Sequence, residues 1–166
     1  MFAYLALVSG SVWLGAYIAR LLSTYSMFEE TELTLKSFID QANLIVIFNI
    51  TIPLVNLTFL SYLVMIIATT LFIIFSSIKF KENGWLFITT AIVYLTLPFE
   101  SMLMILDYKM IMIFINNQFN SELFLRLIVE RLTKLSSFPI IQILSYLTIP
   151  YLLIKKPFKL KIKNEN

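Results

Sequence analysis

From Ala42 to Ile78 the sequence contains no charged residue, and this unbroken apolar run limits the possible folds more than any other feature. A helix that crosses the hydrocarbon layer of a membrane needs roughly 20 apolar residues. The run is too long for one perpendicular span, and Pro53 within it removes a backbone hydrogen-bond donor. We therefore predict a membrane-spanning helix over residues 52–76, starting close to this proline.

The composition of the whole chain favours a membrane protein and excludes several function classes. Hydrophobic residues make up 59% of the sequence and charged residues 14%, whereas soluble domains carry about 25% charged residues. Cysteine and histidine are absent, which removes disulfides, the commonest ligands of zinc and haem, and the usual proton shuttle at neutral pH. We expect no cofactor, no enzymatic activity and no nucleic-acid partner, and the abundance of Phe, Ile, Asn and Lys indicates an AT-rich genome.

Three further segments are apolar enough to cross a membrane, over residues 2–22, 85–106 and 139–154. The first has no basic stretch before its apolar part, so we expect a retained helix rather than a cleaved signal peptide. The predicted fold class is an all-α integral membrane bundle of about four transmembrane helices, forming a single domain over 1–154.

Two segments between the spans carry charge and read as interfacial amphipathic helices, over residues 26–41 and 121–135. Ser26 and Glu29 have the spacing of a capping box, which predicts the start of the first of these helices. In the second, acidic and basic residues alternate at every fourth position, which stabilises a helix; these residues are Glu122, Arg126, Glu130 and Lys134.

The basic tail over residues 155–166 bears on orientation and on partners. With four spans both termini lie on the same side of the membrane, and the concentration of lysines directly after the last span favours the cytoplasmic or matrix side. We expect these lysines to contact anionic lipid; they are Lys155, Lys156, Lys159, Lys161 and Lys163. The membrane is then a bacterial or archaeal plasma membrane or an organellar inner membrane.

Glu100 is the one acidic residue predicted to lie within a span, and it is the candidate functional residue. An ionised carboxylate at bilayer depth is costly, so such residues are functional candidates by default. Glu100 would carry protons, bind a cation or pair with a partner's basic residue; alternatively, Pro98 bends the helix and lifts it to the headgroups. We expect Arg20 and Lys109 to be anchors that reach the interface, with Asp107 solvated beside Lys109.

Small residues recur at every fourth position of the first span and form a candidate helix-packing face. This face comprises Ala6, Gly10, Ser11, Gly15 and Ala19. It would dock another subunit, or equally it would pack within this chain's own bundle. We also expect polar contacts between helices from Asn49, Asn56 and Gln142.

Three short motifs resemble the four-helix CopD-like and HemJ-type membrane proteins. They are Val12-Trp13-Leu14-Gly15, Gly84-Trp85-Leu86, and the stretch from Pro139 to Lys156-Pro157-Phe158. The resemblance implies porphyrin oxidation or copper handling, which in that family relies on intramembrane histidines. Ala6, Leu7 and Val8 stand where the first-helix histidine would be expected, and Ile88 or Thr89 where a lysine would be. The resemblance therefore transfers no catalytic residue.

Three functional hypotheses follow from these features. The first is a non-catalytic subunit of a larger membrane complex, such as a respiratory or other energy-transducing complex, held by other membrane subunits. The second is a small transporter or ion-conducting protein that uses Glu100. The third, an enzyme of porphyrin metabolism of the HemJ type, depends on the resemblance alone.

Overall fold

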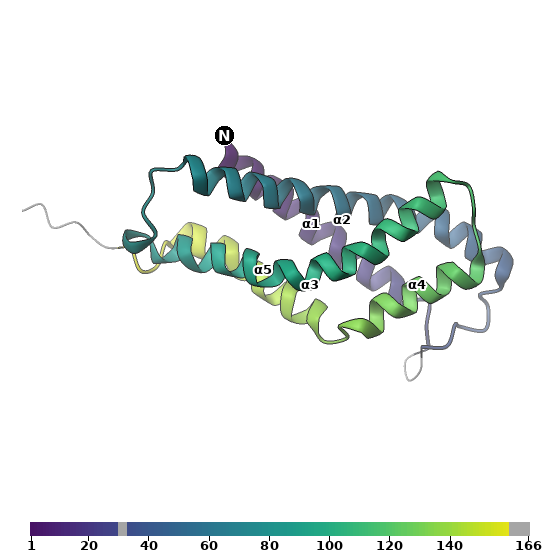
Figure 1. Cartoon of the computed structure of the whole chain (residues 1–166). Helices are drawn as coiled ribbons and strands as arrows, with labels where there is room; N and C mark the ends of the chain where they lie inside the picture. The colour runs from purple at the N-terminus through teal and green to yellow at the C-terminus, as the bar shows by residue number, and fades with distance from the viewer. Residues whose placement is uncertain (30–32, 160–166) are drawn as a thin grey trace, which may run out of the picture.

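The computed structural model describes residues 1–29 and 33–159, with the backbone alone for residues 41 and 42, and these residues form a bundle of five α-helices (Figure 1). Four of the helices are long and apolar enough to cross a membrane. The helices are α1 (Phe2–Tyr25), α2 (Gln41–Phe75), α3 (Gly84–Ile115), α4 (Ser121–Lys134) and α5 (Phe138–Lys155), and a short 3₁₀ turn, η1 (Phe80–Glu82), precedes α3. The all-α membrane bundle predicted from the sequence is confirmed.

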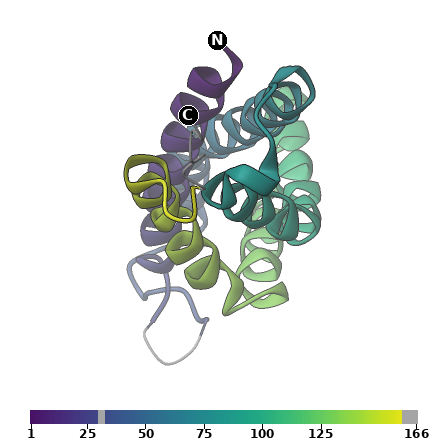
Figure 2. The same cartoon turned by 90° about the vertical axis from the view of Figure 1, so that its left-hand side faces the viewer.

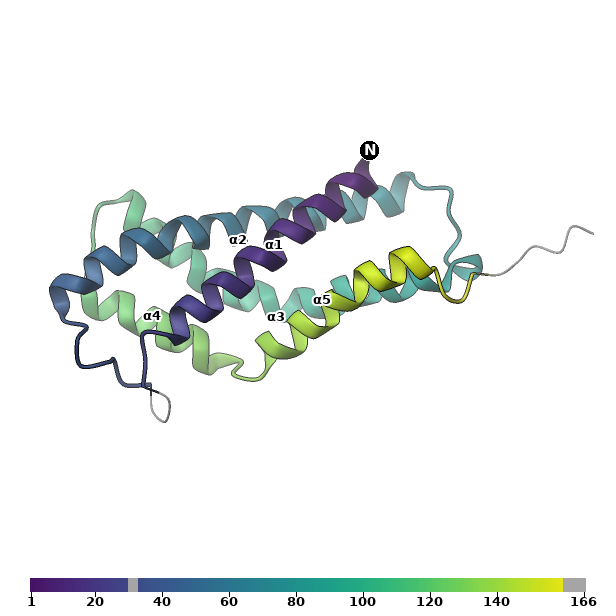
Figure 3. The ribbon, with the colours of Figure 1, turned by 180° about the vertical axis from the view of Figure 1, so that it is seen from behind.

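The two ends of the bundle differ in their content. α4 and α5 follow one another along α3, and the chain from α4 to α5 runs antiparallel to it (Figures 1 and 3). One end, here called the α4 end, contains α4 and the connection between α1 and α2. The opposite end, here called the terminal end, contains the start of α1, the loop before α3 and the end of α5 (Figure 3). Both ends of the described chain therefore lie on one side of the bundle, as four spans require.

α2 begins at Gln41, well before the predicted start near Ile52. Asp40 caps it by accepting a hydrogen bond from the backbone N–H of Asn43 at 2.8 Å. The early turns continue through Pro53 because they bury one helical face at the α4 end; this face comprises Leu44, Phe48, Ile52 and Val55. Tertiary packing thus outweighs the hydrogen bond lost at the proline.

The predicted helix over 26–41 is wrong for the residues that the structure describes. Ser26 caps the end of α1, and Met27 and Phe28 turn inward to join the core at the α4 end. Phe28 pairs with Leu35 in an isolated bridge, and Glu29 donates its backbone N–H to Thr34 at 2.9 Å. Burying two large apolar side chains here stabilises the fold more than one exposed helical turn would. The middle of the segment, 30–32, lies outside the described residues.

The other amphipathic segment does form a helix, α4, and it packs lengthwise on α2 and α3. Its apolar face lies in the core at the α4 end, through Phe124, Leu127, Ile128 and Leu132. On its outer face Lys134 pairs with Glu130 at 3.5 Å, as the alternating charges indicate. The 35 residues of α2 span about 52 Å, whereas the hydrocarbon layer is about 30 Å thick. α4 covers α2 and α3 where these helices extend beyond that layer.

A second core lies at mid-bundle and is aromatic. The ring centroid of Trp13 on α1 lies 5.0 Å from that of Tyr17, 5.3 Å from that of Tyr62 and 4.6 Å from that of Tyr146. Met65 and Val93 complete the cluster. α1 and α5 make few contacts beyond this point, so the two helices meet at the aromatic cluster and separate toward the terminal end (Figures 2 and 3).

Candidate functional site

Four charged side chains converge inside the bundle, and together they form the site that we call the buried charge cluster. They are Arg20 on α1, Glu100 and Asp107 on α3, and Arg131 on α4. Glu100 is 2% exposed and Asp107 is 1% exposed. Ionisable side chains this deeply buried in a membrane bundle are rare and indicate function.

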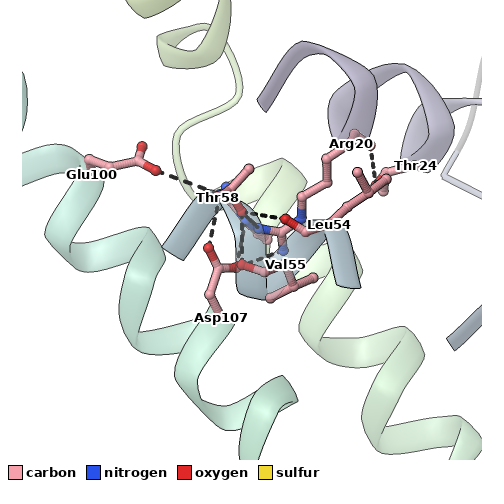
Figure 4. A network of polar contacts seen from close by, with 8 residues as sticks. Arg20, Thr24, Leu54, Val55, Thr58, Glu100 and Asp107 are labelled. Atoms are coloured by element: carbon pink, nitrogen blue, oxygen red, sulfur yellow. Dashed lines mark hydrogen bonds and ion pairs between the residues drawn. The ribbon is translucent and has the colours of Figure 1, made fainter. Parts of the chain in front are cut away.

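Asp107 is the centre of this cluster, because both guanidinium groups donate to it. Arg20 Nη2 lies 2.6 Å from Asp107 Oδ1, and Arg131 Nε lies 2.8 Å from the same oxygen. Arg131 Nη2 donates to Oδ2 at 3.1 Å, which makes the Arg131 pairing bidentate. Figure 4 shows Arg20 extending from α1 toward Asp107, beside Thr58 of α2, whose hydroxyl accepts from Arg20 Nη1 at 3.5 Å.

Helical periodicity brings these four residues together. Glu100 and Asp107 are seven positions apart, or two turns, and so lie on the same face of α3. Arg20 belongs to the buried stripe of α1 that also contains Trp13 and Tyr17. Arg131 lies beside Leu132 of the buried face of α4, and its guanidinium carbon lies 5.7 Å from the centre of the Tyr17 ring.

Arg131 remains charged in this setting. Burial acts to lower the pKa of the guanidinium, but the carboxylates of Asp107 and Glu100 act more strongly in the opposite direction and raise this pKa above its usual value. The Asp107–Arg131 pair is therefore a fixed ionic contact between α3 and α4.

Glu100 is bound much more loosely than Asp107. Its Oε1 lies 3.8 Å from Arg131 Nη2, an ion-pair distance that is too long for a hydrogen bond. Its Oε2 is buried and has no partner among the described residues. Gln142 on α5 lies close to Glu100 and is completely buried, yet neither its oxygen nor its nitrogen has a partner in the described part of the chain.

Three more buried polar atoms at this level lack a partner within the described ranges: Trp13 Nε1, Tyr17 Oη and Tyr62 Oη. A buried polar atom that is left unpaired costs about 1–3 kcal/mol, and native proteins contain only a few. The surroundings of Glu100 concentrate such atoms within the bundle.

The depth of the four charges follows from their positions along the helices. Trp85 starts α3 at the terminal end, and Glu100 lies about 22 Å further along the helix axis, within the hydrocarbon layer. Asp107 lies about 33 Å from Trp85, at the opposite membrane boundary. Arg20 and Arg131 lie beside Asp107, so three charges mark the boundary and Glu100 alone reaches into the membrane.

A small cavity of about 30 Å³ adjoins the charge cluster on the α4 side. Tyr17, Arg20, Thr24, Thr51 and Arg131 contribute polar groups to its wall. A cavity of this size has room for a water molecule.

The structure places the sequence candidates in different settings. Glu100 lies in the bundle interior, and α3 continues as a helix through Pro98. The expectations that Arg20 reaches the interface as an anchor and that Asp107 is solvated are wrong, because the two side chains form a buried ion pair with each other. The signal that identifies Arg20 is its position on the same helical stripe as Trp13 and Tyr17. Gln142 is buried but makes no hydrogen bond to another helix among the described residues, and Asn49 is exposed.

The small-residue face of α1 divides into two parts. An ideal Cβ on Gly10 would lie 3.1 Å from Met65 Sδ of α2, so Gly10 and the half-buried Ala6 face the bundle's interior. Ser11, Gly15 and Ala19 are exposed, and nothing lies within 4 Å of a Cβ built on Gly15.

No family model, curated protein or solved structure matches this chain. Among the described residues there is also no group of three or more His, Cys, Asp or Glu side chains that could hold a metal ion. The buried charge cluster is therefore the feature of the chain that bears most directly on function.

Proposed function

We propose that this chain is a small membrane transport protein that carries protons, with Glu100 as the carboxylate that takes up and releases them. The observation that carries the proposal is the contrast between two acids in one cluster. Asp107 accepts three hydrogen bonds from two guanidinium groups, whereas Glu100 has one distant ion pair and one unpaired oxygen.

The charge balance of the cluster supports this role. Two arginines and two ionised acids give a neutral group, and protonation of Glu100 leaves one excess positive charge. Asp107 accepts hydrogen bonds from both guanidinium groups, so the hydrogen bonds that join the cluster do not include Glu100. A carboxylate inside a membrane that can change its charge without breaking the fold is suited to proton transfer.

The packing around Glu100 favours a proton over a larger solute. Glu100 is close enough to Tyr17, Tyr62 and Tyr146 to interact with them electrostatically. The rings of these tyrosines contact Trp13 at ordinary aromatic packing distances. This leaves little room between them for a solute of several atoms.

Hydroxyl groups extend from this level in both directions. Toward the α4 end, Tyr17 borders the small cavity beside Arg20 and Arg131. Toward the terminal end, Tyr146 and Thr96 share a hydrogen bond of 3.2 Å, and further along Thr70 and Tyr94 share one of 2.6 Å. Such groups both donate and accept, as a relay requires.

The test is proton flux into liposomes that contain the purified chain, driven by a potassium diffusion potential and followed with a pH-sensitive dye. We expect flux above that of protein-free liposomes, and its loss in Glu100→Gln. Glu122→Gln is the matched control, because Glu122 is an exposed glutamate of α4. Glu100→Asp keeps a carboxylate and is expected to retain part of the flux. Equal flux in wild type and Glu100→Gln would overturn the proposal.

A second candidate function is an accessory subunit of a larger membrane complex, and one observation favours it. The exposed part of the small-residue face, Ser11, Gly15 and Ala19, forms a line along α1 that leaves open space over Gly15. Another helix could approach closely there. Gentle extraction of native membranes, followed by native electrophoresis and mass spectrometry, is expected to yield co-migrating subunits that Gly15→Leu releases. Migration of the chain alone would count against this candidate.

A further inference from the structure

A cavity of about 150 Å³ lies at the terminal end of the bundle, away from the charge cluster. It occupies the space that opens where α1 and α5 separate, and α2 and α3 form its floor. Along α3 its wall extends from Trp85 to Val93, a distance of about 12 Å. Its lining is largely apolar, with Met65, Phe72 and Leu86 among the residues on the floor.

This cavity opens sideways, toward lipid. The lining residues that are also exposed all lie on the two helices that separate, namely Ala3, Leu7 and Ser11 on α1 and Pro150 on α5. The lining residues of α2 and α3 are buried or half-buried. An apolar recess that opens between two membrane helices is accessible from the hydrocarbon layer.

An unpaired donor and a lysine lie at the interfacial end of the cavity. Trp85, which is 8% exposed, lines the cavity, and its Nε1 has no partner among the described residues. Lys156, directly after α5, places its Nζ 5.7 Å from the centre of the Trp85 ring. Phe158 accepts a hydrogen bond from the backbone N–H of Gly84 at 3.2 Å, which holds this segment against the start of α3.

Positive charge is concentrated around the same end. Among the described residues it carries five lysines and a single glutamate, Glu82, which pairs with Lys79 at 3.6 Å. The lysines are Lys79, Lys81, Lys155, Lys156 and Lys159. The start of α3 adds the positive end of a helix dipole. An apolar recess that ends beside an unpaired N–H donor and several lysines is complementary to an amphiphile with a negative head.

We propose that this cavity binds an anionic phospholipid, with one acyl chain between α1 and α5 and the phosphate held by Lys156 and the indole N–H of Trp85. The small side chains of α1 create the space: the inward-facing Ala6 and Gly10 line the cavity, and the exposed Ser11 lies at its open side. The part of the small-residue face that points inward therefore serves a lipid rather than a second helix.

Binding is tested by native mass spectrometry of the full chain, released from detergent after incubation with phosphatidylglycerol or phosphatidylcholine. Phosphatidylglycerol is expected to be retained several-fold better. Ala6→Leu, which fills the cavity, and Lys156→Gln, which removes the charge, are both expected to abolish this preference. Ala19→Leu on the exposed side of α1 and Lys134→Gln at the α4 end are the matched controls, and both are expected to bind as wild type does.

Each departure from this pattern overturns the proposal. Equal retention of the two lipids would show that the site does not recognise an anionic headgroup. If Lys156→Gln loses the lipid and Ala6→Leu keeps it, the lipid is attracted by charge outside the cavity. If Ala6→Leu loses the lipid and Lys156→Gln keeps it, the cavity binds an apolar chain without a phosphate contact.

A second measurement does not depend on a cavity-filling variant. In a Trp13→Phe background Trp85 is the remaining tryptophan, and phosphatidylglycerol with a brominated acyl chain is expected to quench its fluorescence more strongly than brominated phosphatidylcholine. Equal quenching by the two lipids would contradict the site.

Discussion

The helices of this bundle are held differently at its two ends, by buried charges at the α4 end and by apolar surfaces at the terminal end. At the α4 end, three helices are joined by buried charges, with Arg20 and Arg131 bound to Asp107 at 2.6 and 2.8 Å. At the terminal end, α1 and α5 separate around an apolar cavity of about 150 Å³. The ion pairs therefore fix the helices against one another at the α4 end, whereas α1 and α5 stay apart at the terminal end. Glu100 lies between these two regions.

The largest expected effect comes from removing the centre of the charged region. Asp107→Ala leaves two buried guanidinium groups without a counterion, and we expect a loss of about 3–5 kcal/mol of stability. Thermal unfolding in detergent, followed by tryptophan fluorescence, measures it. Glu122→Ala is the control, with no significant change expected. A similar small change in both variants would mean that the charges do not hold this end together.

Removing one of the two arginines is expected to have a smaller effect. Arg20→Met leaves Asp107 paired bidentately with Arg131, and the thioether side chain fills part of the space. The loss is that of one hydrogen-bonded ion pair, about 1.5–3 kcal/mol. The same unfolding experiment measures it, and a loss equal to that of Asp107→Ala would contradict the central role given to Asp107.

A substitution in the apolar region is expected to act in the opposite direction. Ala6→Leu places extra methyl groups in the cavity between α1 and α5, and filling a cavity commonly stabilises a protein by about 0.5–2 kcal/mol. The measurement is thermal unfolding in detergent after the bound lipid has been removed. A clear destabilisation would show that this end is packed as closely as the other and has no usable space.

The smallest expected effect on stability is at Glu100. Glu100→Gln replaces a carboxylate that lacks a hydrogen-bonded partner with a neutral group of the same shape, and the expected change is less than about 1 kcal/mol. Wild type and variant are compared by thermal unfolding, beside their proton fluxes. Destabilisation as large as that of Asp107→Ala would make Glu100 a structural ion-pair partner and remove the argument for proton transfer.

Apolar length was sufficient to predict the four spans, because a membrane leaves a chain few alternatives. The start of α2 was not predictable in the same way. Pro53 is a local signal for a helix boundary, and the packing of Phe48 and Ile52 against α4 outweighs it. Likewise, the capping-box spacing of Ser26 and Glu29 did not form a helix, since Met27 and Phe28 are buried in a core that depends on distant helices.

The candidate site was predictable only in part. Glu100 stood out because it is an isolated acid in an apolar segment, and local sequence was enough to select it. Arg20 and Asp107 lie near the ends of apolar segments, where charged residues are common, so nothing local distinguishes a solvated anchor from a buried pair. Their pairing depends on how α1, α3 and α4 meet, and that is set by contacts far apart in the sequence.

The most direct test of the central claim is infrared difference spectroscopy of the full chain in lipid, recorded between acidic and alkaline buffer. If Glu100 takes up and releases a proton, we expect a band of a protonated, buried carboxylic acid at low pH that disappears at high pH. The band is expected to be missing in Glu100→Gln and to remain in Glu122→Gln. A spectrum that is the same for wild type and Glu100→Gln would contradict the account, because Glu100 would then exchange no proton.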